Sequence, residues 1–514
     1  MMRANGVRAL RRIVFSTTRR YDSTGGVYLS MENINSRVAK TSYAVRGSVL
    51  QASQLLQQRL NNGEDLPFHE LVQCNIGNPQ ALLQPPISFF RQVMSLCMNP
   101  ELMQTEKDNL PLYPPDVYAR AKKYLDPKNL KGGAGAYTDS KGMLAARLEV
   151  ASFIGKRDGH PADPEQIFLT NGASEGVRTM MELLVRDPSE GYMDGILTPI
   201  PQYPLYSARL TLGGGALVPY YLVEKDTWGV DISSLKATVQ EARNNGISVR
   251  AMVVINPGNP TGQVLSEADV RSIVKFAAEE NLVLLADEVY QENIWKKGKE
   301  FVSLRKAAFD QGYTAQHGAD RLSLVSFHST SKGFIGECGM RGGYFELHGF
   351  DDAVKDEIYK LMSVGLCSNV PGQIMTGLMV NPPVPGDPSF PKYEAERDTI
   401  LASMKRRARL ITDAFREMEG VNCEDVEGAL YAFPRVHFPP KAEEAAKAAG
   451  IPVDELYCLE MLKETGVIMV PGSGFQQEEG TYHLRCTILP QEEKFPEFIE
   501  RLEKAHREFF NIYR

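Results

Sequence analysis

The 514-residue sequence lacks any arrangement of cysteines that would indicate a disulfide framework or a zinc site. The number of cysteines is odd, and they form neither a C-x-x-C pair nor a cysteine and histidine cluster at metal-ligand spacing. We therefore expect a protein of a reducing compartment, with free thiols and without a structural metal. The seven cysteines stand at positions 74, 97, 338, 367, 423, 458 and 486.

Long apolar runs and an excess of positive charge are also missing. No stretch approaches the roughly 20 apolar residues that a membrane-spanning helix needs, so we expect no integral membrane protein. The net charge is -7, which gives no general reason to expect nucleic-acid binding, because such binding usually rests on a basic surface. The remaining composition, 43% hydrophobic and 24% charged, is that of an ordinary globular protein. The length predicts two domains, or one large domain with a satellite.

The first 21 residues are unlike the rest of the chain. They contain six arginines with serine and threonine between them, and no acidic residue precedes Asp22. This composition is typical of a mitochondrial transit peptide, so we expect a location in the mitochondrial matrix, with an additional cytoplasmic pool left open. The alternative is a basic N-terminus without a targeting role. The last three residues, Ile512 to Arg514, do not form a peroxisomal address.

Between about Glu165 and Leu347 short apolar runs alternate with helical patterns. This alternation predicts an α/β fold with a mostly parallel sheet built from crossover units. Polar clusters follow the strands, and open α/β sheets bind their ligands at the carboxyl ends of strands. The expected strands are 166–170, 195–198, 251–255, 282–286 and 322–327, and the clearest expected helices run from about 174 to 185 and from 266 to about 281.

A proline-rich stretch from Asn381 to Pro391 predicts a domain boundary. Its five prolines cannot continue a helix or a central strand. Beyond it, Glu396 to about Met418 has the pattern of a long helix, and the remaining chain indicates a smaller α+β domain with strands at 466–470 and 483–486. Near the N-terminus, residues 37–60 have helical apolar spacing.

A lysine just past a predicted strand is the first candidate for chemistry. It stands in Ser329-Thr330-Ser331-Lys332-Gly333. A lysine in an apolar pocket has a lowered pKa and can act as a nucleophile toward an aldehyde and then as a general base. The hydroxyls before it, together with Arg341, are suited to holding a phosphate through charge-assisted hydrogen bonds. The ordinary alternative is a solvated surface charge.

Asp287 ends the strand of the V-L-L-A-D-E-V-Y run, where a carboxylate is costly to bury unless it faces a cation or a strong donor. A pyridinium nitrogen is such a partner, and an ionised Asp287 would keep that nitrogen protonated. The alternative is a carboxylate that caps backbone amides. Tyr290 and the amide of Asn259, held in the N-P-G-N-P-T-G turn, are suited to donating to a phenolate oxygen of the same ring.

Three further positions suit parts of one phosphorylated ring and its substrate. The backbone of Ala173 and Ser174 opens a helix and suits a phosphate. Tyr203 could stack on a flat heterocycle, although packing at a domain face explains it equally well. Arg485 lies in an apolar C-terminal stretch and suits a bidentate carboxylate clamp, with a surface ion pair as the alternative.

Taken together and in this order, these motifs resemble the fold-type I, class I/II pyridoxal-phosphate aminotransferases from about Asn75 to Arg485. The resemblance rests on N-x-x-N-P-T-G, D-E-V-Y, S-x-S-K and an arginine in G-M-R-G-G. G-G-A-G-A-Y-T-D-S-K-G from residue 132, the Q-Y-P-L-Y-S-A run and S-K-G-F-I-G-E-C-G-M-R-G-G-Y are similar to the alanine aminotransferase subgroup. One departure stands out: Arg341 lies nine residues after Lys332, where aspartate aminotransferases have eight.

The resemblance implies a role for each candidate residue and a homodimer. Lys332 becomes the Schiff-base lysine, and Asp287 and Tyr290 complete the catalytic set. Gly77 and Arg485 would receive the substrate carboxylate. The cofactor, pyridoxal 5'-phosphate, would further contact Tyr203 as a stacking ring, Asn259 with Tyr290 at its hydroxyl, Ala173, Ser174, Ser329 and Arg341 at its phosphate, and Tyr137 from the other subunit.

The implied reaction is ping-pong transfer of an amino group from L-alanine to 2-oxoglutarate, which gives pyruvate and L-glutamate. The implied domains are an N-terminal arm with part of the small domain at 22–114, a large cofactor-binding domain at 115–380 and a small domain at 381–514. Three other readings remain open. They are a glutamate:glyoxylate aminotransferase, a non-catalytic regulator that senses the cofactor, and a structural α/β protein with accidental motifs.

Overall fold

The computed structural model describes residues 29–31, 33–43, 47–108, 110–318 and 320–514. The chain divides into two compact units, Met1–Lys40 and Thr41–Arg514. The first contains helix α1 (Ser36–Lys40), and the elements below belong to the second. The predicted transit peptide, residues 1–21, lies outside the described residues.

The centre of the second unit is a seven-stranded sheet in the order β2-β8-β7-β6-β5-β3-β4. Strand β8 is antiparallel to both of its neighbours, and the other strands run parallel. The predicted α/β fold with a mostly parallel sheet is therefore confirmed. The strands are β2 (Ile167–Thr170), β3 (Asp194–Ile200), β4 (Ala216–Tyr221), β5 (Ser248–Ile255), β6 (Val283–Asp287), β7 (Leu324–Ser329) and β8 (Gly343–His348).

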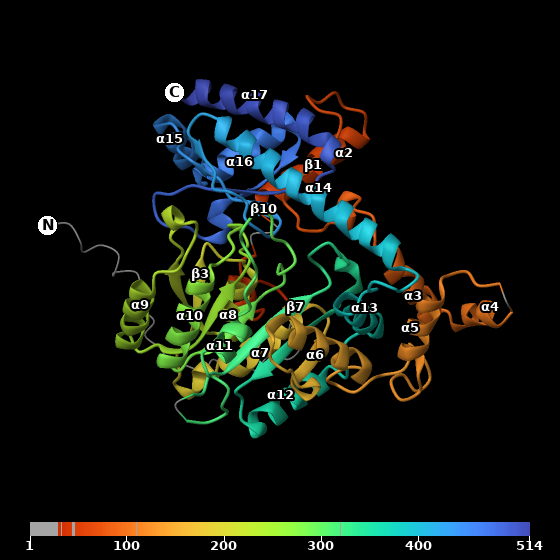
Figure 1. The fold of residues 1–514 in the computed structure, drawn as a ribbon. Coiled ribbons are helices and arrows are strands. Elements are labelled where there is room, and N and C mark those ends of the chain that lie inside the picture. Colours follow the sequence, from red (N-terminus) through yellow and green to blue (C-terminus); the bar gives the residue numbers. More distant parts are fainter. Residues whose placement is uncertain (1–28, 32, 44–46, 109, 319) are drawn as a thin grey trace. The chain divides into compact units, whose positions relative to one another are not determined.

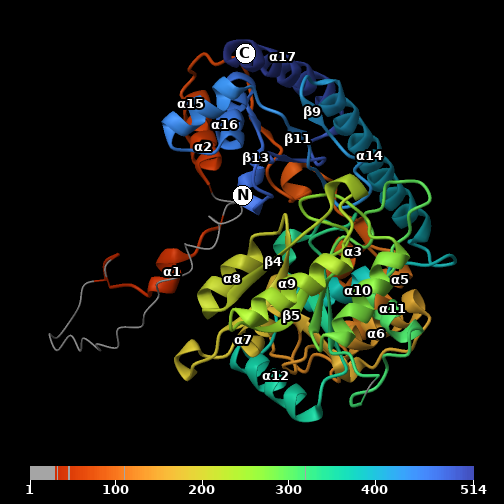
Figure 2. The same ribbon diagram turned by 90° about the vertical axis from the view of Figure 1, so that its left-hand side faces the viewer.

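Helices cover both faces of this sheet. Alternate side chains of each strand point to opposite faces, so each strand contributes to both cores. On β6, Leu284 packs in the core beneath α9 (Ile232–Asn244), α10 (Glu267–Glu279) and α11 (Leu304–Asp310). Its neighbour Leu285 packs on the other face against α7 (Ala173–Leu184), α8 (Leu205–Gly213) and α12 (Asp352–Val364). Figure 2 shows α9, α10 and α11 side by side on one face. This double burial explains why the strands are apolar runs without alternation.

Segments from the two ends of the second unit come together away from the sheet. Strand β1 (Val72–Gln73) pairs in parallel with β12 (Val467–Ile468), and α2 (Ser48–Asn61) packs on α16 (Val453–Thr465). Figure 1 shows α2 and β1 among the C-terminal helices. Strands β9 and β11 form one pair there, and β10, β14 and β13 form a three-stranded sheet in that order. Their bounds are β9 (Val421–Asn422), β10 (Tyr431–Ala432), β11 (Arg435–Val436), β13 (Val470–Pro471) and β14 (Leu484–Thr487).

The remaining helices complete the frame. They are α3 (Ser88–Met98), α4 (Gln104–Lys107), α5 (Pro115–Leu125), α6 (Leu144–Asp158), α13 (Val370–Val380), α14 (Phe390–Glu417), α15 (Pro440–Ala449) and α17 (Phe495–Tyr513). None of the helices in the described part of the chain is long and apolar enough to cross a membrane. Within the same residues no cluster of histidine, cysteine and carboxylate side chains is suited to a metal ion.

Each predicted strand overlaps a strand of the structure, but the sequence missed or misplaced several elements. Strands β4 and β8 were not predicted, and the helical pattern at 37–60 belongs to two helices, α1 and α2. Helix α14 begins at Phe390, six residues before the expected start, because Pro391 occupies its first turn, where the missing N–H is not needed. The proline-rich stretch therefore ends one helix and begins another.

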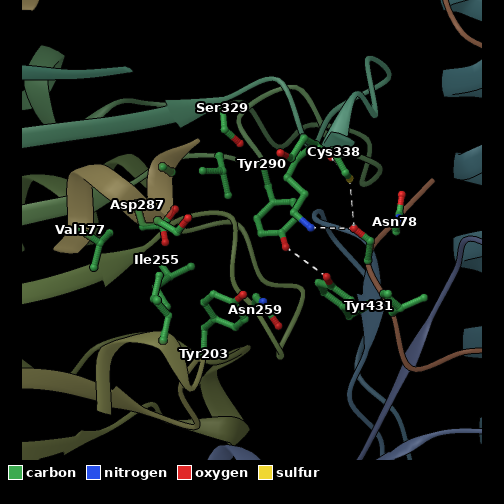
Figure 3. A pocket seen from close by; sticks show the side chains of 18 of the residues that line it. Asn78, Val177, Tyr203, Ile255, Asn259, Asp287, Tyr290, Ser329, Cys338 and Tyr431 are labelled. Atoms are coloured by element: carbon green, nitrogen blue, oxygen red, sulfur yellow. Dashed lines mark hydrogen bonds between the residues drawn. The ribbon is translucent and has the colours of Figure 1, made fainter. Parts of the chain in front are cut away.

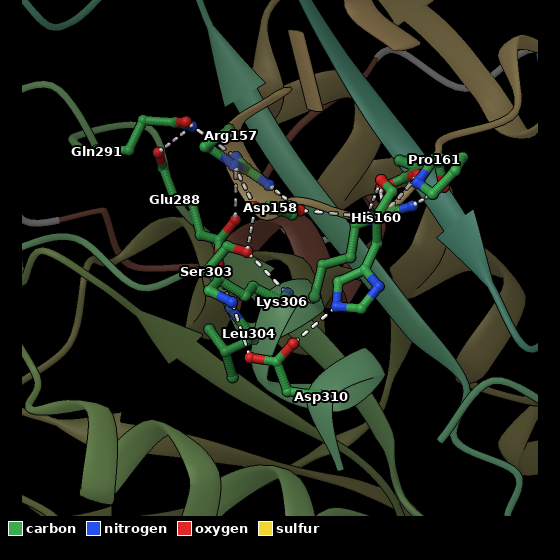
Figure 4. Close-up of polar contacts among 12 residues, drawn as sticks. Arg157, Asp158, His160, Pro161, Glu288, Gln291, Ser303, Leu304, Lys306 and Asp310 are labelled. Atoms are coloured by element: carbon green, nitrogen blue, oxygen red, sulfur yellow. Dashed lines mark hydrogen bonds and ion pairs between the residues drawn. The ribbon is translucent and has the colours of Figure 1, made fainter. Parts of the chain in front are cut away.

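A buried ion network lies behind the carboxyl end of β6 and joins it to α6 and α11 (Figure 4). Arg157 Nε lies 2.7 Å from Asp158, and Glu288 accepts the backbone N–H of Leu304 at 2.8 Å. Burial raises the pKa of Glu288 to about 7. Removing one partner of a buried ion pair leaves an uncompensated charge, so this network is costly to break. It therefore restrains Glu288, the residue after Asp287.

Candidate active site

A cavity of about 300 Å³ opens where the carboxyl ends of β5, β6 and β7 meet the start of α7, the segment after β1, and β14 (Figure 3). Every predicted site residue except one lines it. These residues are Gly77, Ala173, Ser174, Tyr203, Asn259, Asp287, Tyr290, Ser329, Lys332, Arg341 and Arg485. The exception is Tyr137, whose side chain is 77% exposed and which does not line the cavity of its own chain.

Lys332 is half-buried, and its Nζ donates a hydrogen bond of 2.7 Å to the carbonyl of Gly77. The position of this amine requires a glycine opposite it. A Cβ on Gly77 would lie 3.0 Å from the lysine nitrogen and would collide with the hydroxyl of Tyr431. Because Gly77 has no side chain, the cavity in front of the Lys332 amine stays open. A nucleophile needs this access to its target.

Asp287 is the last residue of β6 and is buried. Its Oδ2 accepts a hydrogen bond of 2.8 Å from the hydroxyl of Tyr206, while Oδ1 is buried and has no hydrogen-bond partner among the residues that the structure describes. Burial raises the pKa of this carboxyl, although the Tyr206 hydroxyl opposes the shift. A buried carboxylate oxygen without a partner, at the wall of a cavity, fits a protonated ring nitrogen.

Two tyrosines and an asparagine line the middle of the cavity. The hydroxyl of Tyr290 lies 3.2 Å from that of Tyr431, and Figure 3 shows Asn259, Tyr290 and Tyr203 around the same space. Burial alone would raise the pKa of Tyr431, but the charges of Lys332 and Arg485 outweigh it, so its pKa lies below the usual tyrosine value. These groups can donate hydrogen bonds to an oxygen on a ring bound between them.

The residues predicted to hold a phosphate form a cationic niche at the start of α7. This helix begins at Ala173 with no side-chain cap. The guanidinium of Arg341 lies 3.3 Å from Ser174 Oγ and donates to the carbonyls of Asn171 and Cys338 at 3.0 and 3.1 Å. Uncapped backbone N–H groups, a hydroxyl and a guanidinium suit a dianionic phosphate.

Arg341, nine residues after Lys332, lies in this niche beside Ser174. A 3₁₀ turn at Cys338–Met340 precedes it, and Arg341 has a φ of 51°, in the left-handed region. Opposite the guanidinium, Gly172 has a φ of 81°, and a Cβ there would collide with it. The spacing of nine residues therefore still brings the arginine to the start of α7.

Arg485 lies at the other end of the cavity and is only 2% exposed. Its guanidinium lies between the rings of Tyr431 and Phe475, 4.4 and 4.7 Å from their centres. It donates to the carbonyl of Asn75 at 2.6 Å and to Asn259 Oδ1 at 3.1 Å, and its Nε is buried without a partner. All of these acceptors are neutral. A buried guanidinium held only by neutral groups is suited to an incoming carboxylate.

Sequence reasoning missed several residues of the cavity. Tyr206 belongs to the predicted Q-Y-P-L-Y-S-A run, so its spacing from Tyr203 could have indicated it, whereas no signal distinguished Tyr431 from other core tyrosines. Asn75 contributes a backbone carbonyl, which sequence does not reveal. The cavity residues outside the predicted set are Asn75, Ile76, Asn78, Val177, Leu205, Ile255, Val289, Ser331, Cys338 and Tyr431, and Tyr206 lies behind Asp287.

The fold and the lining of this cavity agree with an aminotransferase. The family model for aminotransferase class I and II matches residues 91–502, and the chain belongs to this family. The resemblance predicted from the motifs is thereby confirmed.

Among its relatives is alanine aminotransferase 2, mitochondrial, from Arabidopsis thaliana, which is 52% identical over 96% of this chain and 90% of the relative. Glutamate--glyoxylate aminotransferase 2 of the same plant is 49% identical, over 94% and 97% of the two chains. A crystal structure of an aminotransferase from Escherichia coli has the same fold, with a TM-score of 0.71, 23% identity and coverage of 94% and 99%.

Proposed function

We propose that this enzyme is an alanine aminotransferase, which converts L-alanine and 2-oxoglutarate into pyruvate and L-glutamate. The observation that supports it most is the placement of Lys332, the unpartnered oxygen of Asp287 and the buried guanidinium of Arg485 around one cavity. The substrate choice rests on the alanine aminotransferase relative at 52% identity. A second candidate, glutamate:glyoxylate transamination, is supported by the relative at 49%.

The cavity fits pyridoxal 5'-phosphate, which supplies an aldehyde and an electron-withdrawing ring. Lys332 would hold it covalently, and Asp287 would face the ring nitrogen. The niche at the start of α7 would hold the phosphate. The full proposed set is Lys332, Asp287, Asn259 and Tyr290 at the ring and its oxygen, Tyr203 as the stacking ring, and Ala173, Ser174, Ser329 and Arg341 at the phosphate, with Tyr137 from the partner of a homodimer.

Residues of this chain would bind the substrate, move its proton and stabilise the ring. Arg485 and Gly77 bind the substrate carboxylate and orient the Cα–H bond. The Lys332 amine, freed when the amino group of the substrate takes its place, would remove the proton from Cα as a general base. As the conjugate acid it would then donate this proton to the cofactor carbon that carried the aldehyde. Asp287, ionised beside the positive ring nitrogen, would keep that nitrogen protonated, so that the ring can accept the electron pair released at Cα.

We further propose a mitochondrial location, on the arginine-rich first 21 residues and on the relative named as mitochondrial. The domain limits at 114/115 and 380/381 also remain proposals. The loop between α13 and α14 supports the second of them, because it separates the last helix against the sheet region from the long helix of the C-terminal part.

The substrate is tested with a panel of amino acids and 2-oxoglutarate as acceptor. L-alanine is expected to exceed glycine in kcat/KM by about 10-fold or more, the scale on which one methyl group is distinguished in a pocket. In the reverse direction, with L-glutamate as donor, pyruvate should be preferred to glyoxylate. A kcat/KM for glyoxylate far above that for pyruvate would replace the proposal with the second candidate.

Arg485→Ala is expected to raise KM for both L-alanine and 2-oxoglutarate by roughly 100-fold, because a truncated partner of a buried charged pair costs about 2–5 kcal/mol of binding. The Kd for pyridoxal 5'-phosphate should change much less than the two KM values, because Lys332 and the groups at the start of α7 are untouched. Steady-state kinetics for the two substrates measure this. Arg435→Ala, at a partly exposed pair with Glu224, is the control. An unchanged KM for both substrates would remove Arg485 from the carboxylate site.

A further inference from the structure

The loop between Lys332 and Arg341 carries both a covalent anchor and a phosphate ligand of the proposed site, yet most of it lies outside the cavity. Its ends are anchored to the rest of the structure. Gly333 N–H donates to Asn293 Oδ1 at 2.9 Å, and Thr330 N–H donates to the carbonyl of Gly342 at 3.1 Å, which continues the pairing of β7 with β8. In the middle of the loop, the backbone N–H of Glu337 donates to the carbonyl of Thr330 at 2.9 Å, and the side chain of Glu337 has a further anchor outside the loop.

Glu337 is held by an arginine of α3. Its side chain is 3% exposed and accepts two hydrogen bonds from Arg91, one from Nε and one from Nη2, each 2.9 Å long. Arg91 Nη2 also donates to Gln80 Oε1 at 2.8 Å. This is a bidentate pair with its carboxylate buried, a geometry with strong orientational preference. Neither Arg91 nor Glu337 lines the cavity.

The same N-terminal segment contacts the loop at two other points. Gln84 Nε2 donates to the carbonyl of Phe334 at 2.7 Å. Gly336, with a φ of 62°, lies so close to Pro79 that a Cβ there would come within 2.9 Å of the proline Cβ. We call Gln80, Gln84 and Arg91 the clasp. The clasp follows directly on Gly77, whose carbonyl accepts from Lys332, so one segment of chain meets the loop from its beginning to Glu337.

A short turn connects Glu337 to Arg341, the proposed phosphate ligand. The 3₁₀ turn that begins at Cys338 follows it, the N–H of Met340 donates to the Glu337 carbonyl at 3.1 Å, and the carbonyl of Cys338 accepts from Arg341 Nη1 at 3.1 Å. The turn that Glu337 precedes thus supports the guanidinium at the niche.

We propose that Arg91 and Glu337 are positioning residues, which hold the 3₁₀ turn of the loop so that Arg341 is fixed at the phosphate niche. This inference rests on the proposed cofactor site.

The test compares two ligands of the cofactor-free protein, pyridoxal 5'-phosphate and pyridoxal, which lacks the phosphate. Glu337→Gln keeps the side-chain shape but removes the charge. It should raise the Kd for pyridoxal 5'-phosphate about ten-fold, as expected for a modest misplacement of a binding group, and change the Kd for pyridoxal by less than about two-fold. Arg91→Gln should act alike, and the double variant should be no weaker than the weaker single, because both changes break one interaction.

Glu492→Gln is the matched control, because Glu492 forms a bidentate pair with Arg406 at 2.6 and 2.8 Å away from the cavity. It should bind both ligands like the native protein. If Glu337→Gln does not fold, Arg91→Lys, which keeps the charge but gives up the bidentate geometry, takes its place. Equal weakening of both ligands, or no weakening, would overturn the positioning role alone. A native protein that binds neither ligand would overturn the proposed cofactor site, and the clasp's role with it.

Discussion

Lys332→Ala is expected to abolish transamination, with a loss of at least roughly 10⁴-fold in kcat, the upper end of what one positioned proton-transfer group contributes. The amine is the group at the cavity that can both attack an aldehyde and carry the Cα proton, and Gly77 leaves the space in front of it open. Borohydride reduction followed by peptide mass spectrometry should label Lys332 in the native enzyme and no lysine in the variant.

The variant should still bind pyridoxal 5'-phosphate, although more weakly, because the groups at Asp287 and at the start of α7 are untouched. Lys236→Ala is the control and should keep native turnover. Lys236 lies on α9 and forms an exposed ion pair with Glu279 of α10. Retained turnover in Lys332→Ala, or borohydride labelling of a different lysine, would show that the cofactor is held elsewhere.

Asp287→Asn is expected to lower kcat by about 10³-fold, the scale of losing one preorganised electrostatic group. The amide keeps the shape of the side chain and can still accept from Tyr206, but it has no charge to keep the ring nitrogen protonated. Because Oδ1 of Asp287 has no other partner in the structure, the effect should be on the reaction and on cofactor affinity rather than on folding. Turnover, cofactor titration and thermal unfolding measured together separate these effects.

Asp413→Asn, on the exposed side of α14, serves as the control. Native turnover in Asp287→Asn would mean that the carboxylate is structural and that the ring nitrogen is not its partner. A large loss of thermal stability with normal turnover in the surviving protein would lead to the same conclusion.

Much of this site could be predicted because of how parallel sheets are built. Asn259, Asp287 and Lys332 each follow an apolar run, and the carboxyl ends of parallel strands meet at one edge, so the order of motifs alone brings them together. These three residues line one cavity for this reason, whereas Gly77, after β1, and Arg485, in β14, reach it from outside the central sheet. Their roles, and that of Tyr137 across a dimer, stay predictions.

The parts that sequence did not reveal depend on contacts between distant segments. The carbonyl of Asn75 holds Arg485, and the hydroxyls of Tyr290 and Tyr431 meet, only because β1 pairs with β12 and β10 with β14. No local pattern encodes such pairings between short strands. Strand β8 was missed for a similar reason, because a strand that returns antiparallel interrupts the alternation of strand and helix.

The pairing of β1 with β12 also bears on the order in which the parts of the site are synthesised. The chain is made from its N-terminus, so a nascent chain that has passed β8 already contains Lys332, Asp287 and Arg341. It does not yet contain Arg485, which donates a hydrogen bond to the carbonyl of Asn75 in the folded enzyme. The residues proposed for the cofactor are therefore synthesised before the guanidinium proposed for the substrate carboxylate. A nascent chain at this stage could bind the cofactor but would lack that guanidinium.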